Sequence, residues 1–448
     1  MNHDATRRRF LVGAALALPV GTLEAARKIS ANDKIRMAAI GLGIMGNKDC
    51  ATALKVPGVE LVAACDLYTG RLQAAREKYG SGLATTKDYR ALLDRSDIDA
   101  VLIATCDKWH APIAMEAMKK RKAVYCEKPI VREIAEGNAV LATQKQTGAI
   151  MQIGSQLVSS LAFAKAREQY RAGAIGQLNC IEAAYDRQSA LGAWEYTMPT
   201  DASPQTVDWN RYIQDGPAIP YDNKKFFWWR NYREFGTGVA GDLFVHLLSG
   251  VHTIVGAHGP TRIYASGQLA YWKDGRNVPD ILTAIMDYPQ TSLHPAFQLT
   301  LRVDFVSGRG EQAATRLIGS EGIMNMDWSG FSIEKHRMSK APGIGGWDAL
   351  DTYPKSMQQE LLKRYNQKYS AADQRESTPP PVKFAVPDNY DEHVVHMRNF
   401  FDAMRGAATL NEDAVFGFRA AAPSLACNKS YFEKKIVEWD PETMTLKS

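Results

Sequence analysis

The chain has 448 residues, about three times the commonest domain size, so two domains are expected. Hydrophobic residues make up 45% and charged residues 23%, which excludes a disordered or fibrous chain. The net charge of +5 is small and dispersed, which argues against a nucleic-acid partner. Six cysteines form no C-x-x-C pair and no cluster has metal-ligand spacing, so we expect neither a disulfide framework nor a metal site.

The N-terminus has the pattern of a targeting segment. Arg8-Arg9-Phe10 precedes the short, Ala-rich apolar run Leu11–Val20, which is typical of a twin-arginine export signal. An amphipathic first helix is the alternative, and the nearest candidate cleavage site is Glu24-Ala25-Ala26. We therefore expect residues 1–32 to be a signal and linker, and the mature protein to be periplasmic or extracellular. Beyond this segment no apolar stretch approaches the ~20 residues that span a bilayer.

A strand–turn–helix unit follows the linker. Residues 34–40 form an apolar run of strand length that ends in the G-x-G-x-x-G sequence Gly41-Leu42-Gly43-Ile44-Met45-Gly46. A helical segment after Gly46 stops near Pro57, and a second strand, Val59–Cys65, is closed by Asp66. This order of strand, glycines, helix, strand and acid predicts a dinucleotide-binding unit, with a ligand-free glycine turn as the alternative.

Each part of this unit has a mechanical role in dinucleotide binding. Gly41 permits the tight turn, Gly43 lets the backbone approach a pyrophosphate, and Gly46 allows close helix–strand packing. The helix start offers free N–H groups to the phosphates, beside Ile44 and Met45. Asp66 lies 20 residues after Gly46, where its carboxylate accepts from the ribose hydroxyls and favours NAD. Arg71 is close enough to weaken that preference, so NADP is not excluded.

Strands and helices continue to alternate up to residue 155. The predicted strands are 98–105, 122–126 and 149–154, and the predicted helices run from about 112 to 120 and from 131 to 147. This alternation predicts an α/β fold with a doubly wound parallel sheet over residues 33–155. Ligands bind at the carboxyl ends of such strands, which is where the loops Thr105–His110 and Glu127–Pro129 fall.

The alternation of strands and helices ends in residues 156–448. Strands are predicted at 179–185, 263–271, 281–288, 297–306 and 323–326, mostly without helices between them. They indicate an α+β domain with a large, mostly antiparallel open sheet, one face of which is free for ligand or subunit contact. Residues 337–387 read as a long surface excursion with one helix, 356–369, and helices at 391–405 and 413–434 finish the chain.

The segment Gly238–Gly256 combines a core stripe with polar residues. The apolar positions Leu243, Leu247, Val251 and Ile254 recur at helical spacing. Asp242 and His246 are four residues apart and therefore share one helix face, with Asp242 in the first turn, where the helix dipole favours a carboxylate. A contact confined to the helix surface is the alternative for this pair.

Together these motifs resemble the Gfo/Idh/MocA oxidoreductase family, which includes inositol dehydrogenase, glucose-fructose oxidoreductase and NAD-dependent glycosidases. The resemblance rests on motifs that span most of residues 34–445: Gly41–Gly46, Asp107–Pro112, Glu127-Lys128-Pro129, Asp208-Trp209, Gly216-Pro217-Ala218, Phe227–His246 and Trp439-Asp440-Pro441. It implies a Rossmann domain, an NAD cofactor, a sugar or glycoside substrate, and dimerisation through the open sheet. Trp109-His110 and the export signal resemble the secreted branch of the family.

The resemblance also implies site residues. Lys128, Asp242 and His246 would be catalytic: His246 as a base near neutral pH, Asp242 as its partner, and Lys128 as a proton relay or carbonyl polariser. The expected cofactor-binding set is Gly41, Gly43, Ile44, Met45, Gly46, Asp66, Arg71, Thr105, Trp109, His110, Glu127 and Lys128. The expected substrate set is Tyr185, Arg187, Trp209, Arg230 and His246. The aromatic run Phe226–Trp229 is either a stacking surface for sugar rings or a packing element.

Export limits the reaction, because no pool of NAD is available outside the cytoplasm. We therefore expect a tightly held cofactor that is recycled in the site by an oxidoreductase. The alternative is an NAD-dependent glycoside hydrolase that uses transient oxidation at C3, elimination and re-reduction. Phe244 and Val245 stand where its α-N-acetylgalactosaminidase branch has a Tyr beside the His, which counts against that activity. A non-catalytic sugar-binding module is a lesser alternative.

Overall fold

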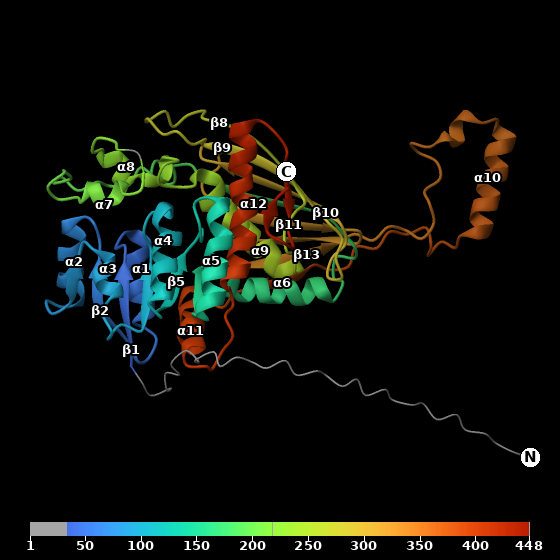
Figure 1. The fold of residues 1–448 in the computed structure, drawn as a ribbon. Helices are drawn as coiled ribbons and strands as arrows, with labels where there is room; N and C mark the ends of the chain where they lie inside the picture. Colours follow the sequence, from blue (N-terminus) through green and yellow to red (C-terminus); the bar gives the residue numbers. More distant parts are fainter. Residues whose placement is uncertain (1–33, 217, 448) are drawn as a thin grey trace, which may run out of the picture.

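The computed structural model describes residues 34–216 and 218–447. The expected export signal, and Pro217 of the Gly216-Pro217-Ala218 motif, lie outside the described residues. Among the described residues, no helix combines the length and apolar character needed to cross a bilayer. The described chain forms two sheets, which lie beside each other in Figure 1 with helices packed between and around them.

The first sheet has six parallel strands in the order β3-β2-β1-β4-β5-β6. Its strands are β1 (Ile35–Ile40), β2 (Val59–Cys65), β3 (Ala84–Thr86), β4 (Ala100–Ile103), β5 (Ala123–Glu127) and β6 (Met151–Gly154). The helices between them are α1 (Ile44–Ala53), α2 (Thr69–Tyr79), α3 (Tyr89–Leu93), η1 (Asp107–Trp109), α4 (His110–Lys119) and α5 (Ile134–Thr147). The strand order reverses between β1 and β4, so the chain leaves the sheet in opposite directions there and opens a crevice.

The second sheet has ten strands in the order β14-β13-β12-β11-β7-β10-β9-β8-β15-β16. Its strands are β7 (Leu178–Asp186), β8 (Arg262–Gln268), β9 (Ile281–Tyr288), β10 (Phe297–Asp304), β11 (Gln312–Gly319), β12 (Gly322–Met326), β13 (Gly330–Lys335), β14 (Val382–Ala385), β15 (Val437–Asp440) and β16 (Thr445–Leu446). Neighbours are antiparallel except β7 and β10, which are parallel. The mostly antiparallel α+β domain predicted from the sequence is thus confirmed.

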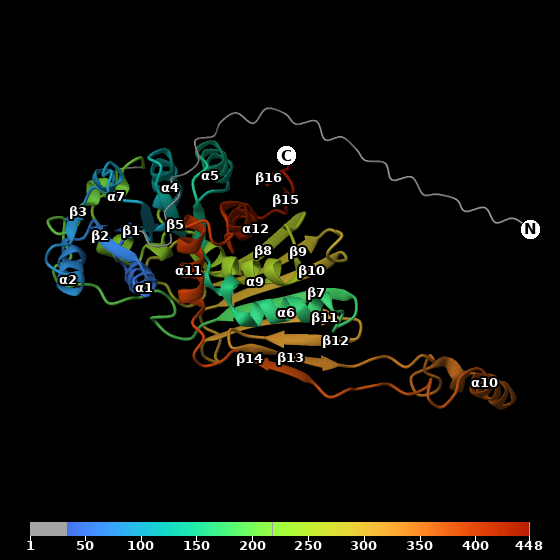
Figure 2. The same cartoon turned by 90° about the horizontal axis from the view of Figure 1, so that it is seen from below.

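Within residues 34–216 and 218–447, helices cover one face of the second sheet and leave the other bare. α6 (Leu161–Arg171), α9 (Val245–Val255) and α12 (Ala414–Glu433) lie along the covered face, as Figure 2 shows. Residues alternate accordingly: on β8, Ile263 and Ala265 are buried, whereas Tyr264 is 48% exposed. The uncovered face is the open surface expected from the sequence. The other helices of this half are η2 (Gln156–Ser159), α7 (Trp209–Ile213), α8 (Asn223–Phe227), η3 (Trp229–Asn231), η4 (Ala240–Phe244), η5 (Ala349–Thr352), α10 (Lys355–Lys368) and α11 (Glu392–Met404).

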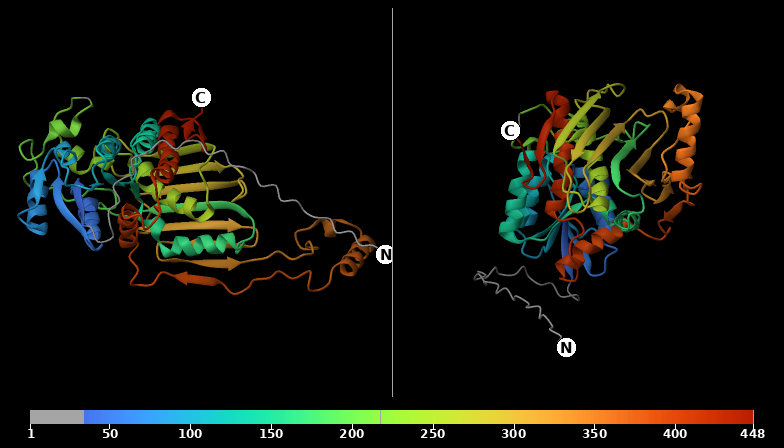
Figure 3. Two further views of the ribbon diagram at one scale, coloured as in Figure 1. Left: turned by 60° about the horizontal axis from the view of Figure 1, so that its bottom comes forward. Right: turned by 90° about the vertical axis from the view of Figure 1, so that its right-hand side faces the viewer.

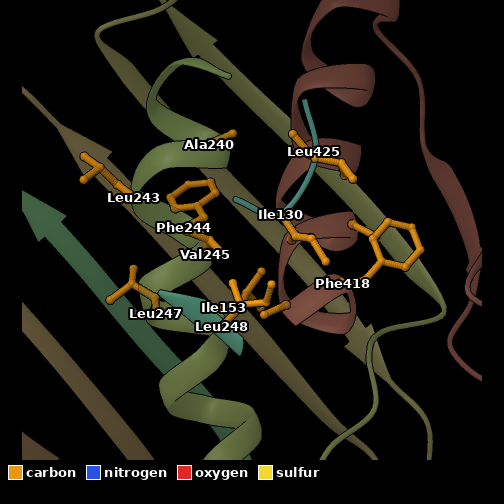
Figure 4. Close-up of a cluster of buried hydrophobic side chains, with 14 of the residues drawn as sticks. Ile130, Ile153, Ala240, Leu243, Phe244, Val245, Leu247, Leu248, Phe418 and Leu425 are labelled. Carbon is orange, nitrogen blue, oxygen red and sulfur yellow. The ribbon is translucent and has the colours of Figure 1, made fainter. Parts of the chain in front are cut away.

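One hydrophobic core joins the two halves of the molecule. The predicted stripe Leu243, Leu247, Val251 and Ile254 is at most 2% exposed. Figure 4 shows η4 and α9 packed beside Leu425 and Phe418 of α12, with Ile130 and Ile153 arriving from the first sheet. Because both halves contribute to this cluster, the carboxyl edge of the first sheet is held firmly against η4.

The helix that carries Asp242 differs from the prediction near its start. Residues 238 and 239 are α-helical as predicted, but Ala240–Phe244 form one π-helical turn, and α9 continues from Val245. Such turns interrupt α-helices most often at functional sites. Asp242 remains in the first turn, as expected.

The long excursion predicted at 337–387 is present between β13 and β14. It carries α10 well away from the rest of the molecule, as Figure 3 shows. Its end also adds the edge strand β14, which the sequence pattern did not predict.

Candidate active site

The glycine turn after β1 is shaped to receive a phosphate. Gly41 has φ +91°, and a Cβ there would lie 2.5 Å from the Ala104 carbonyl oxygen. A Cβ at Gly46 would overlap the Gly41 carbonyl. At Gly43 the nearest atoms are those of Arg71, 4.0 Å away, so the backbone is open to an approaching ligand. This geometry fits the three roles that the motif assigns to its glycines.

The helix start beside this turn supplies unpaired N–H groups. α1 begins at Ile44, inside the motif and not after Gly46 as expected. Among the described residues no side chain caps it, and its first turn contains no acidic residue. Free amides and the positive end of the helix dipole therefore face the crevice, as an anionic pyrophosphate requires.

Asp66 closes the crevice at the end of β2. Its carboxylate accepts hydrogen bonds from the amides of Leu42 (2.8 Å) and Tyr68 (2.9 Å), and it is 5% exposed. Arg71 Nη1 lies 3.6 Å from Asp66 Oδ2. These contacts fix the carboxylate where it can accept from a ribose, while Arg71 places a positive charge within reach of the same ligand.

One cavity connects these groups to the second motif loop. It runs along the carboxyl edge of the first sheet, and Asp66 and Lys128 are among its lining residues. Of the cofactor-binding set expected from the sequence, all but Gly46 line it: Gly41, Gly43, Ile44, Met45, Asp66, Arg71, Thr105, Trp109, His110, Glu127 and Lys128. Gly46 contributes close packing beneath the turn instead.

The second half of the molecule walls the far side of this cavity with aromatic rings. Phe226 and Phe227 line it and lie 5.9 and 5.5 Å from the Arg71 guanidinium, measured from Cζ to the ring centroids. The packing alternative for Phe226–Trp229 is seen at these two residues, which contact Arg71 and each other, and the stacking alternative stays a prediction. They are 5% and 7% exposed, and they lie on the side of the cavity that holds Asp66 and Arg71.

Lys128, Asp242 and Arg230 meet in a buried ion cluster. Lys128 Nζ donates to Asp242 Oδ1 (2.9 Å) and to the Asp242 carbonyl oxygen (2.8 Å). Arg230 Nε donates to the same Oδ1 over 3.1 Å. Burial raises the pKa of Asp242, but the Lys128 and Arg230 charges outweigh it and hold that pKa below its usual range. Asp242 is therefore an ionised anchor that positions two cations.

His246 lies one turn further along the same helix. It is half-buried, and its Nδ1 is buried without a hydrogen-bond partner in the described part of the chain. Burial and the Lys128 charge lower its pKa well below the ordinary value, although Asp242 opposes the shift. The imidazole is thus neutral near pH 7, and Nε2 is the ring nitrogen left for a substrate to reach.

Two expected substrate residues lie on the His246 side, at the end of β7. The Arg187 guanidinium sits 5.0 Å from the Tyr185 ring centroid, and its Nη1 donates to the Gly192 carbonyl (2.9 Å). Arg187 contributes to the lowered pKa of His246. Neither Tyr185 nor Arg187 lines the cofactor cavity, so both belong to the opposite side of the ion cluster.

Trp209 does not belong to this constellation. Its ring packs 5.2 Å from Tyr212 and 6.1 Å from Phe235, centroid to centroid, and its Nε1 donates to the Ile219 carbonyl. It is 7% exposed and does not line the cofactor cavity. The expectation that Trp209 contacts substrate is corrected: it is a packing residue of α7.

His110 and Glu127 line the cavity but are also braces. His110 bonds through Nδ1 to the Pro129 carbonyl (2.7 Å), which ties the loop after β4 to the loop after β5. Burial lowers its pKa to about 4, so it is neutral. Glu127 accepts from Gln156, and burial raises its pKa to about 6 despite the Lys128 charge.

Sequence reasoning missed Asp107. This residue lines the cavity and is 1% exposed, and its Oδ2 accepts from the Thr237 amide (2.9 Å) and hydroxyl (2.7 Å). Its Oδ1 has no partner among the described residues. Burial, with the Asp242 charge, raises its pKa to about 7. The available signal was an acidic residue in the loop after a parallel strand. It was overlooked because only Trp109 and His110 were considered in that motif.

These features fit a bound dinucleotide, with an anion-ready glycine turn at one end and the ion cluster at the other. Within the described residues no group of three or more His, Cys, Asp and Glu side chains is placed to hold a metal. A glycine turn at the switch point of a parallel sheet, beside a second open sheet, defines the class of two-domain dinucleotide-binding oxidoreductases.

Family models match both halves of the chain. Residues 35–155 match the model described as "Oxidoreductase family, NAD-binding Rossmann fold", and residues 212–438 match "Oxidoreductase family, C-terminal alpha/beta domain". The chain therefore belongs to the Gfo/Idh/MocA oxidoreductase family, as its motifs indicated.

Individual relatives share shorter segments. An inositol 2-dehydrogenase of Salmonella typhimurium is 29% identical over 175 residues, which cover 39% of this chain and 50% of that protein. A glycosyl hydrolase family 109 protein of Shewanella baltica is 31% identical over 165 residues, 34% of this chain and 35% of that protein. The chain thus matches half or less of the length of these relatives.

Among solved structures, levoglucosan dehydrogenase in complex with NADH superposes with a TM-score of 0.63 at 16% identity. The superposition covers 91% of this chain and 99% of that one. At this identity the likeness establishes the shared fold.

Proposed function

We propose that the protein is an NAD-dependent oxidoreductase that removes hydride from a hydroxyl-bearing carbon of a sugar or polyol. The observation that carries this proposal is the Lys128–Asp242–Arg230 cluster, with neutral His246 beside it, at the inner end of the dinucleotide cavity. The inositol dehydrogenase relatives support a polyol or sugar as the substrate class. Asp66 supports NAD as the preferred cofactor.

The chain's own residues supply what alcohol oxidation needs besides a hydride acceptor. When bound, NAD supplies that acceptor at its nicotinamide ring. Neutral His246 takes the hydroxyl proton, although burial and Lys128 hold its pKa well below the near-neutral value expected from the sequence; the Asp242 carboxylate favours the imidazolium that forms. Lys128, held by Asp242, donates a hydrogen bond to the substrate oxygen as the carbonyl forms. Arg230 donates to the same Asp242 oxygen as Lys128 and helps to hold this carboxylate in place.

We further propose that the protein is exported by the twin-arginine route with its cofactor bound and recycled in the site. The Arg8-Arg9-Phe10 pattern supports export, and the absence of an extracellular NAD pool then requires recycling. The bare face of the ten-stranded sheet supports assembly of a homo-oligomer through that face. Cell fractionation and light scattering of the purified protein test these two points separately.

A glycoside hydrolase is the second candidate, because a glycosyl hydrolase family 109 protein is 31% identical to this chain over 165 residues. Phe244 stands where the α-N-acetylgalactosaminidase branch has a Tyr beside the His, and it is fully buried in the core, so it cannot take that residue's place at a substrate.

One experiment separates the two candidates. Purified protein is incubated without added NAD with a panel of polyols and sugars and, separately, with aryl glycosides. The oxidoreductase predicts substrate-dependent ultraviolet absorbance of reduced nicotinamide and no aglycone release. Sustained aglycone release with no net change in that absorbance would instead establish the hydrolase. Neither signal from any substrate, in a second incubation with NAD added, would contradict both.

A further inference from the structure

A second cavity lies away from the cofactor crevice, where α6, the end of α9 and the start of α12 come together. It encloses about 530 Å³ and shares no lining residue with the cofactor cavity. Its polar lining residues are Ser159, Ser160, Arg167, Arg171, His252, Thr253, His258, Tyr390, Asn411, Asp413 and Arg419. A pocket of this size accommodates a monosaccharide-sized ligand.

Three arginines from two helices face this cavity. Arg167 and Arg171 are one turn apart on α6, so they lie on the same helix face. Within residues 34–216 and 218–447 neither has an ion-pair partner. Arg419 of α12 is 4.0 Å from a Glu442 carboxylate oxygen, and its Nε is buried without a partner in the same described part.

Negative charge in the lining is scarce. Asp413 is the acidic residue there, and its Oδ1 accepts from the Phe416 amide as the cap of α12. Glu442 lies at the rim, where it also contacts His258 over 3.0 Å. The guanidinium groups therefore outnumber the carboxylates that could neutralise them.

A buried imidazole provides a further open polar position. His252 lines the cavity although it is only 2% exposed, and its Nε2 pairs with the Tyr288 hydroxyl (2.9 Å). Its Nδ1 has no hydrogen-bond partner in the described chain. Buried polar atoms are almost always satisfied, so this buried and unpaired nitrogen is an unfilled polar position behind the cavity wall.

We propose that this cavity is a binding site for a sugar that carries a phosphate or sulfate group. The planar guanidinium fork matches the oxygens of such groups in paired hydrogen bonds, and three arginines line this cavity. The remaining volume and the Ser, Asn and Tyr hydrogen-bonding groups accommodate the sugar.

The site lies where the segment before α6 meets the segment between α11 and α12. Ser159 precedes α6 on the chain from the first sheet, and Asn411 lies between α11 and α12. Asn411 Nδ2 donates to Ser159 Oγ over 2.9 Å, so the two segments already touch. A ligand bound here stabilises this contact without entering the catalytic cluster.

Calorimetric titration of the full-length, NAD-saturated protein tests the proposal, because the cofactor prevents phosphate from binding at the glycine turn. The probes are inorganic phosphate, inorganic sulfate, glucose 6-phosphate and glucose 6-sulfate, with glucose as the uncharged control. We expect the two sugar esters to bind most tightly and glucose not to bind. Affinity should fall about tenfold for each arginine lost in Arg167→Gln and Arg171→Gln, which lie on the surface of α6 and leave the core intact.

The matched control is Arg316→Gln, an arginine on the bare sheet face that pairs with Glu182. It should leave binding unchanged. Binding of inorganic phosphate or sulfate as tightly as the sugar esters, lost in the α6 variants, would show that free oxyanions are the natural source and would support the oxyanion site. Absence of binding, or binding that survives Arg167→Gln and Arg171→Gln together, would overturn the proposal.

Discussion

The two ends of the cofactor cavity are built in different ways. At the outer end, the backbone forms the binding surface. The turn at Gly41, the open approach at Gly43 and the uncapped start of α1 come from six consecutive residues. At the inner end, side chains form it: Lys128, Arg230 and Asp242 come from three separate segments and meet through hydrogen bonds of 2.9 to 3.1 Å. The first end is a local conformation, whereas the second depends on how the whole chain packs.

The largest effect is expected at the inner end. Lys128→Ala should lower turnover by about 10²–10⁴-fold while NADH binding changes little, because Lys128 acts on the substrate oxygen. Steady-state turnover and NADH fluorescence titration measure the two quantities. Lys165→Ala, which removes an exposed lysine from α6, serves as the control and should behave as the native protein. A variant that loses cofactor affinity and retains turnover would show that Lys128 binds the cofactor and does not act on the substrate.

A smaller effect is expected when the outer end is overpacked. Gly46→Ala places a Cβ against the Gly41 carbonyl, so the turn must shift and NADH affinity should fall about tenfold to a hundredfold. Gly82→Ala is a matched control, since a Cβ at Gly82 meets no atom within 4 Å. Equal NADH affinity in the two variants would show that the turn tolerates displacement.

Removing the carboxylate at the end of β2 should change cofactor choice. Asp66→Ala deletes the acceptor for the Leu42 and Tyr68 amides and leaves Arg71 without its 3.6 Å partner. NAD affinity should fall about tenfold, and NADP should gain relative to NAD. Parallel titrations with the two reduced cofactors measure the ratio. An unchanged ratio would mean that Asp66 only braces the turn.

The smallest effect concerns stability and pH. Asp107 has a folded pKa raised to about 7 by burial and by Asp242, so the folded state keeps a proton that the unfolded state has lost. The stability that this group contributes is complete below the unfolded pKa of 3.8 and is lost as pH rises through about 7. Asp107→Asn should remove this part of the pH dependence, at most about 1.4 kcal/mol per pH unit.

Urea unfolding of the native protein and the Asp107→Asn variant at several pH values between these limits measures the difference. Parallel curves for the two proteins would show that Asp107 is ionised throughout. The comparison with native protein is essential because Glu127, with a pKa of about 6, titrates over the same window in both.

The outer end could be predicted from the sequence nearly to the residue. The glycines, Asp66 and the alternation of strands and helices are local signals, and only the start of α1 at Ile44 was displaced. The open second sheet was also predictable from strands without intervening helices. In contrast, the sequence predicted the helix α11 but not the strand β14. For neither element did it indicate which other elements it packs against.

The inner end shows why the remaining site contacts could not be predicted from the sequence. The sequence indicated Lys128, Asp242 and Arg230 as candidates, but not that both cations share one carboxylate oxygen. Asp107 acquires its raised pKa only through burial against Asp242, 135 residues later. Trp209 and Phe226 have the same apolar character in the sequence. Both rings pack against Tyr212, and only the fold decides that Phe226 also lines the cofactor cavity whereas Trp209 does not.

The position of α11 determines the order in which the chain can mature. Its Phe400, Phe401 and Met404 complete the cluster around Ile35 and Met37 on one side of the first sheet, although more than 350 residues separate them. A ribosome must therefore synthesise nearly the whole polypeptide before the nucleotide-binding half can close. A fragment ending at residue 155 would expose this hydrophobic surface and should aggregate. We therefore expect chaperones to bind the chain during its synthesis.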